Sequence, residues 1–155
     1  MNKAIFLDRD GTINIDTGYV HTPESFVFIN GIFEFCHKAQ DNGFLLIVIT
    51  NQSGIERGYF TETDYNNTTQ HMINGFAMRG ITITDVLHCP SLSGPNRKPA
   101  PGLFLKARDK HDIDMKSSIN IGDKKRDLEA GRAAGVGTNI LFSGNYPDIF
   151  NKAIN

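Results

Sequence analysis

Two aspartates, Asp8 and Asp10, stand one residue apart directly after a short apolar run at residues 4–7. The run is too short for a helix and is typical of a strand buried on both faces. In open α/β sheets ligands bind outside the carboxyl ends of the strands, where one carboxylate can attack a substrate and the other can transfer protons. Gly11 follows at once and permits a sharp turn and the close approach of a ligand. Asp and Gly are also ordinary turn residues, so the motif alone leaves open an aspartate-rich turn.

Polar and charged side chains follow three later segments that we expect to be strands as well. They are Thr50, Asn51, Gln52 and Ser53 after residues 44–49, Arg97 and Lys98 after residues 82–88, and Asp123 after residues 118–122. The hydroxyl, carboxamide and backbone groups of the first set suit phosphoryl oxygens, although a polar loop that caps the next helix fits the same pattern. Because the carboxyl ends of parallel strands meet at one edge of a sheet, we expect all these groups to lie near Asp8 and Asp10.

Three acids in one place need a positive partner, because Asp8, Asp10 and Asp123 would repel one another if left bare. A hard divalent cation removes this repulsion, and oxygen ligands together with a substrate phosphate favour Mg²⁺. Lys98 would then offset the charge of a phosphoryl group or an aspartyl-phosphate. Preorganised charge of this kind supplies much of the catalysis in phosphoryl transfer.

Apolar runs alternate with segments of helical spacing along the whole chain. Strands are expected at residues 4–7, 44–49, 82–88, 118–122 and 139–142, and helices at residues 30–43, 61–80, 101–111, 128–135 and 146–155. We expect Asn30 to cap the first helix and Thr61 with Asp64 to form a capping box. The alternation predicts an α/β fold, a doubly wound, Rossmann-like parallel sheet of five strands with right-handed crossovers. The length of 155 residues suits one domain, residues 1–155.

The composition is typical of a soluble globular protein, with 39% hydrophobic and 21% charged residues. Lys and Arg number 16 against 17 Asp and Glu, so no global field attracts nucleic acid or an anionic membrane. Cys36 and Cys89 have no disulfide-framework spacing, which suits a reducing cytosol. No signal peptide or membrane span is expected, because Asp8 interrupts the N-terminal apolar run. We therefore expect a cytoplasmic protein without nucleic-acid or membrane partners. A monomer is expected as well, but no sequence feature bears on the oligomeric state.

Resemblance to a known family rests on four motifs in order, which read Asp8-Arg-Asp-Gly-Thr, Thr50-Asn-Gln-Ser-Gly, Arg97-Lys98-Pro and Gly122-Asp123-Lys. They resemble the motifs of phosphatases of the haloacid dehalogenase (HAD) superfamily, over residues 5–142. Within it the chain is similar to the branch of D-glycero-D-manno-heptose 1,7-bisphosphate 7-phosphatases and histidinol-phosphatases. The resemblance implies a Mg²⁺-dependent phosphomonoester hydrolase for a sugar bisphosphate. Histidinol phosphate or another small sugar phosphate is the alternative substrate.

The resemblance also implies a role for each matching residue. Asp8 would be the nucleophile that forms an aspartyl-phosphate, and Asp10 the acid/base, while Thr50 and Lys98 would stabilise the phosphoryl group. The implied metal ligands are the Asp8 carboxylate, the Asp10 backbone carbonyl and Asp123. The expected substrate-binding positions are Asp16, Thr17, Gly18, Tyr19, Asn51, Gln52, Ser53, Arg97 and Lys124, with Arg57 as a further cation at the mouth. Asp127 is interpreted as a helix cap or a residue behind the metal ligands, with ligation as the less favoured alternative.

The loop before Arg97 departs from the family. Many relatives carry a structural zinc there, whereas residues 89–96 contain a single cysteine, Cys89. One thiol cannot make the four-ligand site that zinc needs, so we expect no zinc and leave the effect of this loop on substrate specificity open. The connections are also too short for a cap domain, so loops alone must close the mouth of the site.

Two rival functions share parts of this pattern. In a signalling receiver domain the phosphorylated aspartate follows the third strand, where this chain has His88, Cys89 and Pro90. A DNA 3′-phosphatase binds a polyanion, and a net charge of −1 gives little help there. The sequence leaves open a local basic groove made of Arg57, Arg97, Lys124, Lys125 and Arg126. Turnover of a small phosphate ester separates the first rival from an enzyme.

Overall fold

Five parallel strands form one sheet in the order β3-β2-β1-β4-β5, in a computed structural model that describes residues 1–154. The strands are β1 (Lys3–Leu7), β2 (Phe44–Asn51), β3 (Asp85–Cys89), β4 (Ile119–Gly122) and β5 (Thr138–Leu141). The predicted doubly wound sheet is therefore confirmed. None of the helices within residues 1–154 is both long and apolar enough to cross a membrane.

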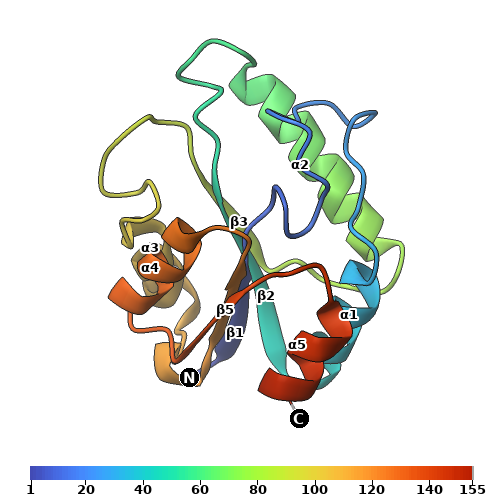
Figure 1. Cartoon of the computed structure of the whole chain (residues 1–155), viewed down its shortest axis with the longest axis vertical. Coiled ribbons are helices and arrows are strands. Elements are labelled where there is room, and N and C mark those ends of the chain that lie inside the picture. The colour runs from blue at the N-terminus through green and yellow to red at the C-terminus, as the bar shows by residue number, and fades with distance from the viewer. Residues whose placement is uncertain (155) are drawn as a thin grey trace.

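Helices cover both faces of the sheet (Figure 1). They are α1 (Ile32–Asp41), α2 (Glu62–Ala77), α3 (Gly102–His111), α4 (Lys125–Ala133) and α5 (Tyr146–Ala153), with a short 3₁₀ helix at Met115–Ser117. Side chains alternate across β1, so Ile5 and Leu7 pack with α1, α2 and α5, whereas Ala4 and Phe6 pack with α3 and α4. A strand buried on both faces in this way reads as a continuous apolar run in the sequence.

The site is positioned by the place of β1 in the sheet. Its Ile5 pairs with Leu46 of β2 on one side and with Ile119 of β4 on the other. The chain runs outward from β1 through β2 to β3 and then returns to β4, so the strand order reverses between β1 and β4. In doubly wound sheets this switch point forms the crevice in which ligands bind, and Asp8 stands at its floor.

Two predicted helix starts have different outcomes. The capping box is confirmed, because the Thr61 hydroxyl accepts from the Asp64 backbone N–H (3.1 Å) and the Asp64 carboxylate accepts from the Thr61 N–H (2.9 Å). The prediction of Asn30 as the cap of α1 is wrong. The chain enters α1 through Gly31, whose φ of 90° is left-handed, and no side chain caps the helix there. Strand β2 also runs further than predicted and includes Thr50 and Asn51.

Candidate active site

Three carboxylates, Asp8, Asp123 and Asp127, lie at the carboxyl ends of β1 and β4 with oxygen atoms within 4.8 Å of one another. The Asp8 backbone N–H donates to the Ile121 carbonyl (3.0 Å) and fixes the first acid beside β4. The buried Asp123 Oδ1 has no hydrogen-bond partner within residues 1–154. A buried anionic oxygen without a partner is costly, and an oxygen-only cluster of this kind fits a hard divalent cation.

The electrostatics of Asp8 agree with that fit. The pKa of the Asp8 carboxyl is raised to about 8, chiefly by burial and to a smaller extent by the charges of Asp127 and Asp10, while Lys98 opposes the rise. Asp8 therefore holds its negative charge less readily than an exposed aspartate. A bound cation lowers the pKa of the groups around it and would keep this carboxylate charged.

Lys98 is a buried positive group beside these acids and is 2% exposed. Its Nζ lies 2.9 Å from Asp8 Oδ1 and 2.8 Å from Asp127 Oδ1, and it donates to the Ile49 carbonyl (2.6 Å). Burial lowers the pKa of Lys98, but the neighbouring carboxylates outweigh burial and hold it above its ordinary value. The Asn51 side chain fixes the Lys98 backbone, accepting from its N–H (3.0 Å) and donating to its carbonyl (3.1 Å).

Asp127 both begins a helix and neutralises Lys98. Its Oδ2 accepts from the Lys124 backbone N–H (3.0 Å), which caps α4, while its Oδ1 faces the Lys98 ammonium. The helix-capping interpretation is thus found in the structure, and the same residue belongs to the acidic cluster.

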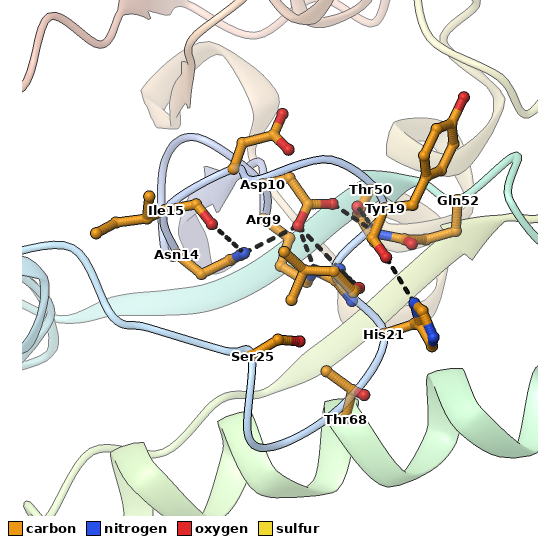
Figure 2. A network of polar contacts seen from close by, with 12 residues as sticks. Arg9, Asp10, Asn14, Ile15, Tyr19, His21, Ser25, Thr50, Gln52 and Thr68 are labelled. Atoms are coloured by element: carbon orange, nitrogen blue, oxygen red, sulfur yellow. Dashed lines mark hydrogen bonds and ion pairs between the residues drawn. The ribbon is translucent and has the colours of Figure 1, made fainter. Parts of the chain in front are cut away.

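Asp10 is held by three side chains, two from the turn after β1 and one from the loop after β2 (Figure 2). Its Oδ1 accepts from Arg9 and Asn14, and its Oδ2 accepts from the Gln52 amide (3.0 Å). The same Gln52 amide donates to the Thr50 hydroxyl (2.9 Å).

A pocket of about 280 Å³ opens above these groups. It is lined by Asp8, Asp10, Asp16, Gly18, Tyr19, Asn51, Gln52, Ser53, Gly54, Arg57, Arg97, Lys98, Lys124, Arg126 and Asp127. The acids and Lys98 form one part of the lining. Three further cations, Arg57, Arg97 and Lys124, come from loops around it, and a fourth, Arg126, comes from the first turn of α4. At its edge Tyr19 packs edge-on against Tyr59, with ring centres 4.8 Å apart.

Comparisons with known proteins place this arrangement in a family. The sequence pattern described as haloacid dehalogenase-like hydrolase matches residues 10–140. The chain belongs to the haloacid dehalogenase-like hydrolases. A D-glycero-alpha-D-manno-heptose-1,7-bisphosphate 7-phosphatase of Campylobacter jejuni is 50% identical over 140 residues, which cover 90% of this chain and 81% of that protein.

Two further relatives agree with this membership. A D-glycero-beta-D-manno-heptose-1,7-bisphosphate 7-phosphatase of Vibrio cholerae is 46% identical over 93% of this chain and 83% of its own length. The crystal structure of D,D-heptose 1,7-bisphosphate phosphatase from B. bronchiseptica, complexed with magnesium and phosphate, superposes with a TM-score of 0.85 at 28% identity. That match covers 97% of this chain and 86% of the other.

Most residues singled out from the sequence line the pocket of this HAD-like hydrolase, and their individual roles stay predictions. Three do not line it, namely Thr17, Thr50 and Asp123, although Asp123 belongs to the acidic cluster beside it. The Thr50 side chain is buried and accepts from Gln52, and Thr17 is exposed. Arg126 lines the pocket without having been predicted as a site residue, and its place in the basic run 124–126 was the available signal.

Proposed function

We propose that this HAD-like hydrolase is a Mg²⁺-dependent phosphatase that removes the 7-phosphate of D-glycero-D-manno-heptose 1,7-bisphosphate. The names of its relatives from C. jejuni and V. cholerae support this substrate. The observation that carries the proposal is that one pocket joins the acidic cluster to four additional cations, Arg57, Arg97, Lys124 and Arg126. One phosphoryl group occupies the acidic end, so the other cations suit a second phosphate.

The chain's own groups support a two-step reaction. The Asp8 carboxylate attacks phosphorus, the bond to the leaving oxygen breaks, and the Asp10 carboxyl gives that oxygen its proton. Asp10, now ionised, takes a proton from water, which attacks the aspartyl-phosphate and releases inorganic phosphate. Lys98 stabilises the phosphoryl charge throughout.

Asp8, the Asp10 backbone carbonyl and Asp123 would hold the Mg²⁺, as the magnesium in the B. bronchiseptica relative also supports. When bound, the cation neutralises phosphoryl charge and keeps Asp8 ionised.

We further propose that the chain works as a single domain without a cap. The mouth of the pocket is then formed by the loops that carry Tyr19 and Tyr59.

The test is phosphate release from a substrate panel: both anomers of the heptose 1,7-bisphosphate, histidinol phosphate, and a 3′-phosphorylated oligonucleotide. We expect the highest kcat/KM with a heptose bisphosphate, with the 1-phosphate retained in the product by ³¹P NMR. Faster turnover of histidinol phosphate or of the oligonucleotide would assign the site to that substrate instead. Uptake of one phosphate per chain without turnover would make it a phosphoacceptor domain.

Arg97 tests the second phosphate separately. Arginine binds phosphate through a planar fork that lysine lacks, so Arg97→Lys should weaken the bisphosphate more than a monophosphate with the same leaving group. An equal loss of kcat/KM for both would mean that Arg97 serves the transferred phosphate.

A further inference from the structure

The proton-transferring group proposed above, Asp10, has an unusually complete set of side-chain partners. Asp10 Oδ1 accepts from Arg9 Nε (3.2 Å), Arg9 Nη2 (2.9 Å) and Asn14 Nδ2 (3.0 Å). Asp10 Oδ2 accepts from Gln52 Nε2 (3.0 Å). The donors approach from three directions, so together they fix the rotation of a carboxyl group that is otherwise free about its terminal bond (Figure 2).

Arg9 is itself immobilised. It is 1% exposed, its Nη2 also donates to the Val20 carbonyl (2.6 Å), and its guanidinium lies 5.7 Å from the centre of the Phe26 ring. Val20 directly follows the pocket-lining residues Gly18 and Tyr19. Arg9 therefore joins Asp10 to the loop that forms one wall of the pocket.

This arrangement is costly for a purely structural role. Arg9 Nη1 is buried and has no hydrogen-bond partner within residues 1–154. A buried donor left unpaired destabilises a protein, whereas an apolar side chain of similar size would fill the same space without that cost. The part of Arg9 that is well paired is the part that contacts Asp10 and the loop.

Gln52 is a second buried donor to Asp10 and contacts the other carboxylate oxygen, Oδ2. It is 4% exposed, and its amide nitrogen is shared between Asp10 Oδ2 and the Thr50 hydroxyl. The sequence predicted Gln52 as a substrate contact, but this amide nitrogen is directed at two groups of the site itself. Asn14 is brought to Asp10 by the turn after β1, in which the Gly11 N–H donates to the Asn14 carbonyl (2.8 Å).

We propose that Arg9, Asn14 and Gln52 are positioning residues that hold the Asp10 carboxyl in line with the leaving oxygen, with Arg9 linking it to the loop at Val20. The inference rests on the acid role of Asp10 in the proposed function. An acid that is displaced by 1 Å loses about 100-fold in rate, so hydrogen bonds that fix the orientation of the Asp10 carboxyl group have a large effect on catalysis.

The experiment separates proton donation from the rest of the site by the choice of leaving group. An alkyl phosphate needs a proton on its departing oxygen, whereas p-nitrophenolate leaves without one. The value of kcat/KM reports only the steps up to phosphorylation of Asp8, so later hydrolysis does not obscure the comparison. Arg9→Lys and Gln52→Met should each lower kcat/KM for the alkyl phosphate by about 10–100-fold and that for p-nitrophenyl phosphate by less than about threefold.

The matched control is Arg79→Lys. Arg79 stacks on Phe33 (3.8 Å from the ring centre) and donates to the Gly75 carbonyl (2.8 Å), and it does not line the pocket. Its replacement should leave kcat/KM for both substrates unchanged within about twofold. Circular dichroism and thermal melts check the fold of each variant. Gln52→Met decides the matter if Arg9→Lys does not fold, because Gln52 comes from a different segment.

Asp10→Asn in the same two assays distinguishes the two levels of the proposal. If Asp10→Asn lowers kcat/KM equally for both substrates, Asp10 is not the acid, and the proposed mechanism and this inference are both wrong. A second outcome separates the two roles: Asp10→Asn lowers kcat/KM mainly for the alkyl phosphate, whereas Arg9→Lys and Gln52→Met lower kcat/KM equally for both substrates or for neither. In that case Asp10 is the acid, but the positioning role is overturned.

Discussion

Replacing Gly11 by alanine should disrupt the cation site, because the added Cβ atom would displace the Asp123 carboxylate. An ideal Cβ at Gly11 would lie 2.1 Å from Asp123 Oδ2 and 2.6 Å from Asp123 Cγ. Side-chain Cβ atoms essentially never approach other atoms closer than 3.0 Å, so the Asp123 carboxylate must move by roughly 1 Å. A misplacement of that size costs about 100-fold in rate. We therefore expect Gly11→Ala to lower kcat/KM by about 100-fold and to raise the Mg²⁺ concentration needed for half-maximal activity.

Gly135→Ala is the matched control for this variant. Gly135 has a φ of 87° against 86° for Gly11, so both alanines carry the same left-handed backbone strain of about 1–2 kcal/mol. Apart from Gly135 and its chain neighbours, no described residue has an atom within 4 Å of the Cβ position at Gly135. Thermal denaturation should show similar destabilisation by that strain in both, whereas only Gly11→Ala should change the Mg²⁺ titration. An unchanged Mg²⁺ titration in folded Gly11→Ala would show that Asp123 does not hold the cation.

Three further results are expected. Tyr59→Ala should raise KM for the sugar bisphosphate by about two- to tenfold, because it removes an aromatic pair worth about 0.5–1.5 kcal/mol from Tyr19, whereas Tyr59→Phe should not. The pKa of Asp64 lies below its ordinary 3.8 because it accepts hydrogen bonds from Thr61, so its stabilisation is complete above that pH and is lost as the pH falls through the lower folded value. Urea unfolding should therefore show Asp64→Asn less stable than the parent at pH 6, with the difference shrinking under acid; a constant difference would contradict this. Chelation should abolish turnover and added Mg²⁺ should restore it, so full activity without a divalent cation would refute the metal site.

The sheet and the gathering of the four motifs were predictable because both depend on local patterns. Buried parallel strands give continuous apolar runs, and their carboxyl ends meet by geometry. The ends of elements were less predictable. Asn30 looked like a helix cap from its residue type, but the backbone at Gly31 decides where α1 begins.

Side-chain pairs far apart in the sequence left no signal to predict from. The hydrogen bond from Gln52 to Asp10 spans 42 positions, and Asp127 meets Lys98 only because β4 lies beside β1. The sequence shows Arg9 only as part of a motif, since its burial and its contact with the Val20 carbonyl depend on the path of the following loop. Residue types and spacing could thus indicate which side chains lie at the same edge of the sheet, but not which of them form hydrogen bonds or ion pairs with one another.

The strand order also determines when the site exists during folding. Asp8, Asp10 and Lys98 all precede β4 in the chain, whereas Asp123 and Asp127 follow it. A nascent chain therefore carries the nucleophile and its lysine long before it carries the acids that complete the cluster, and the cluster forms only once Ile119 has paired with Ile5. Phosphatase activity recovered during refolding should consequently count only molecules in which β4 has paired with β1, even where the first three strands have already paired.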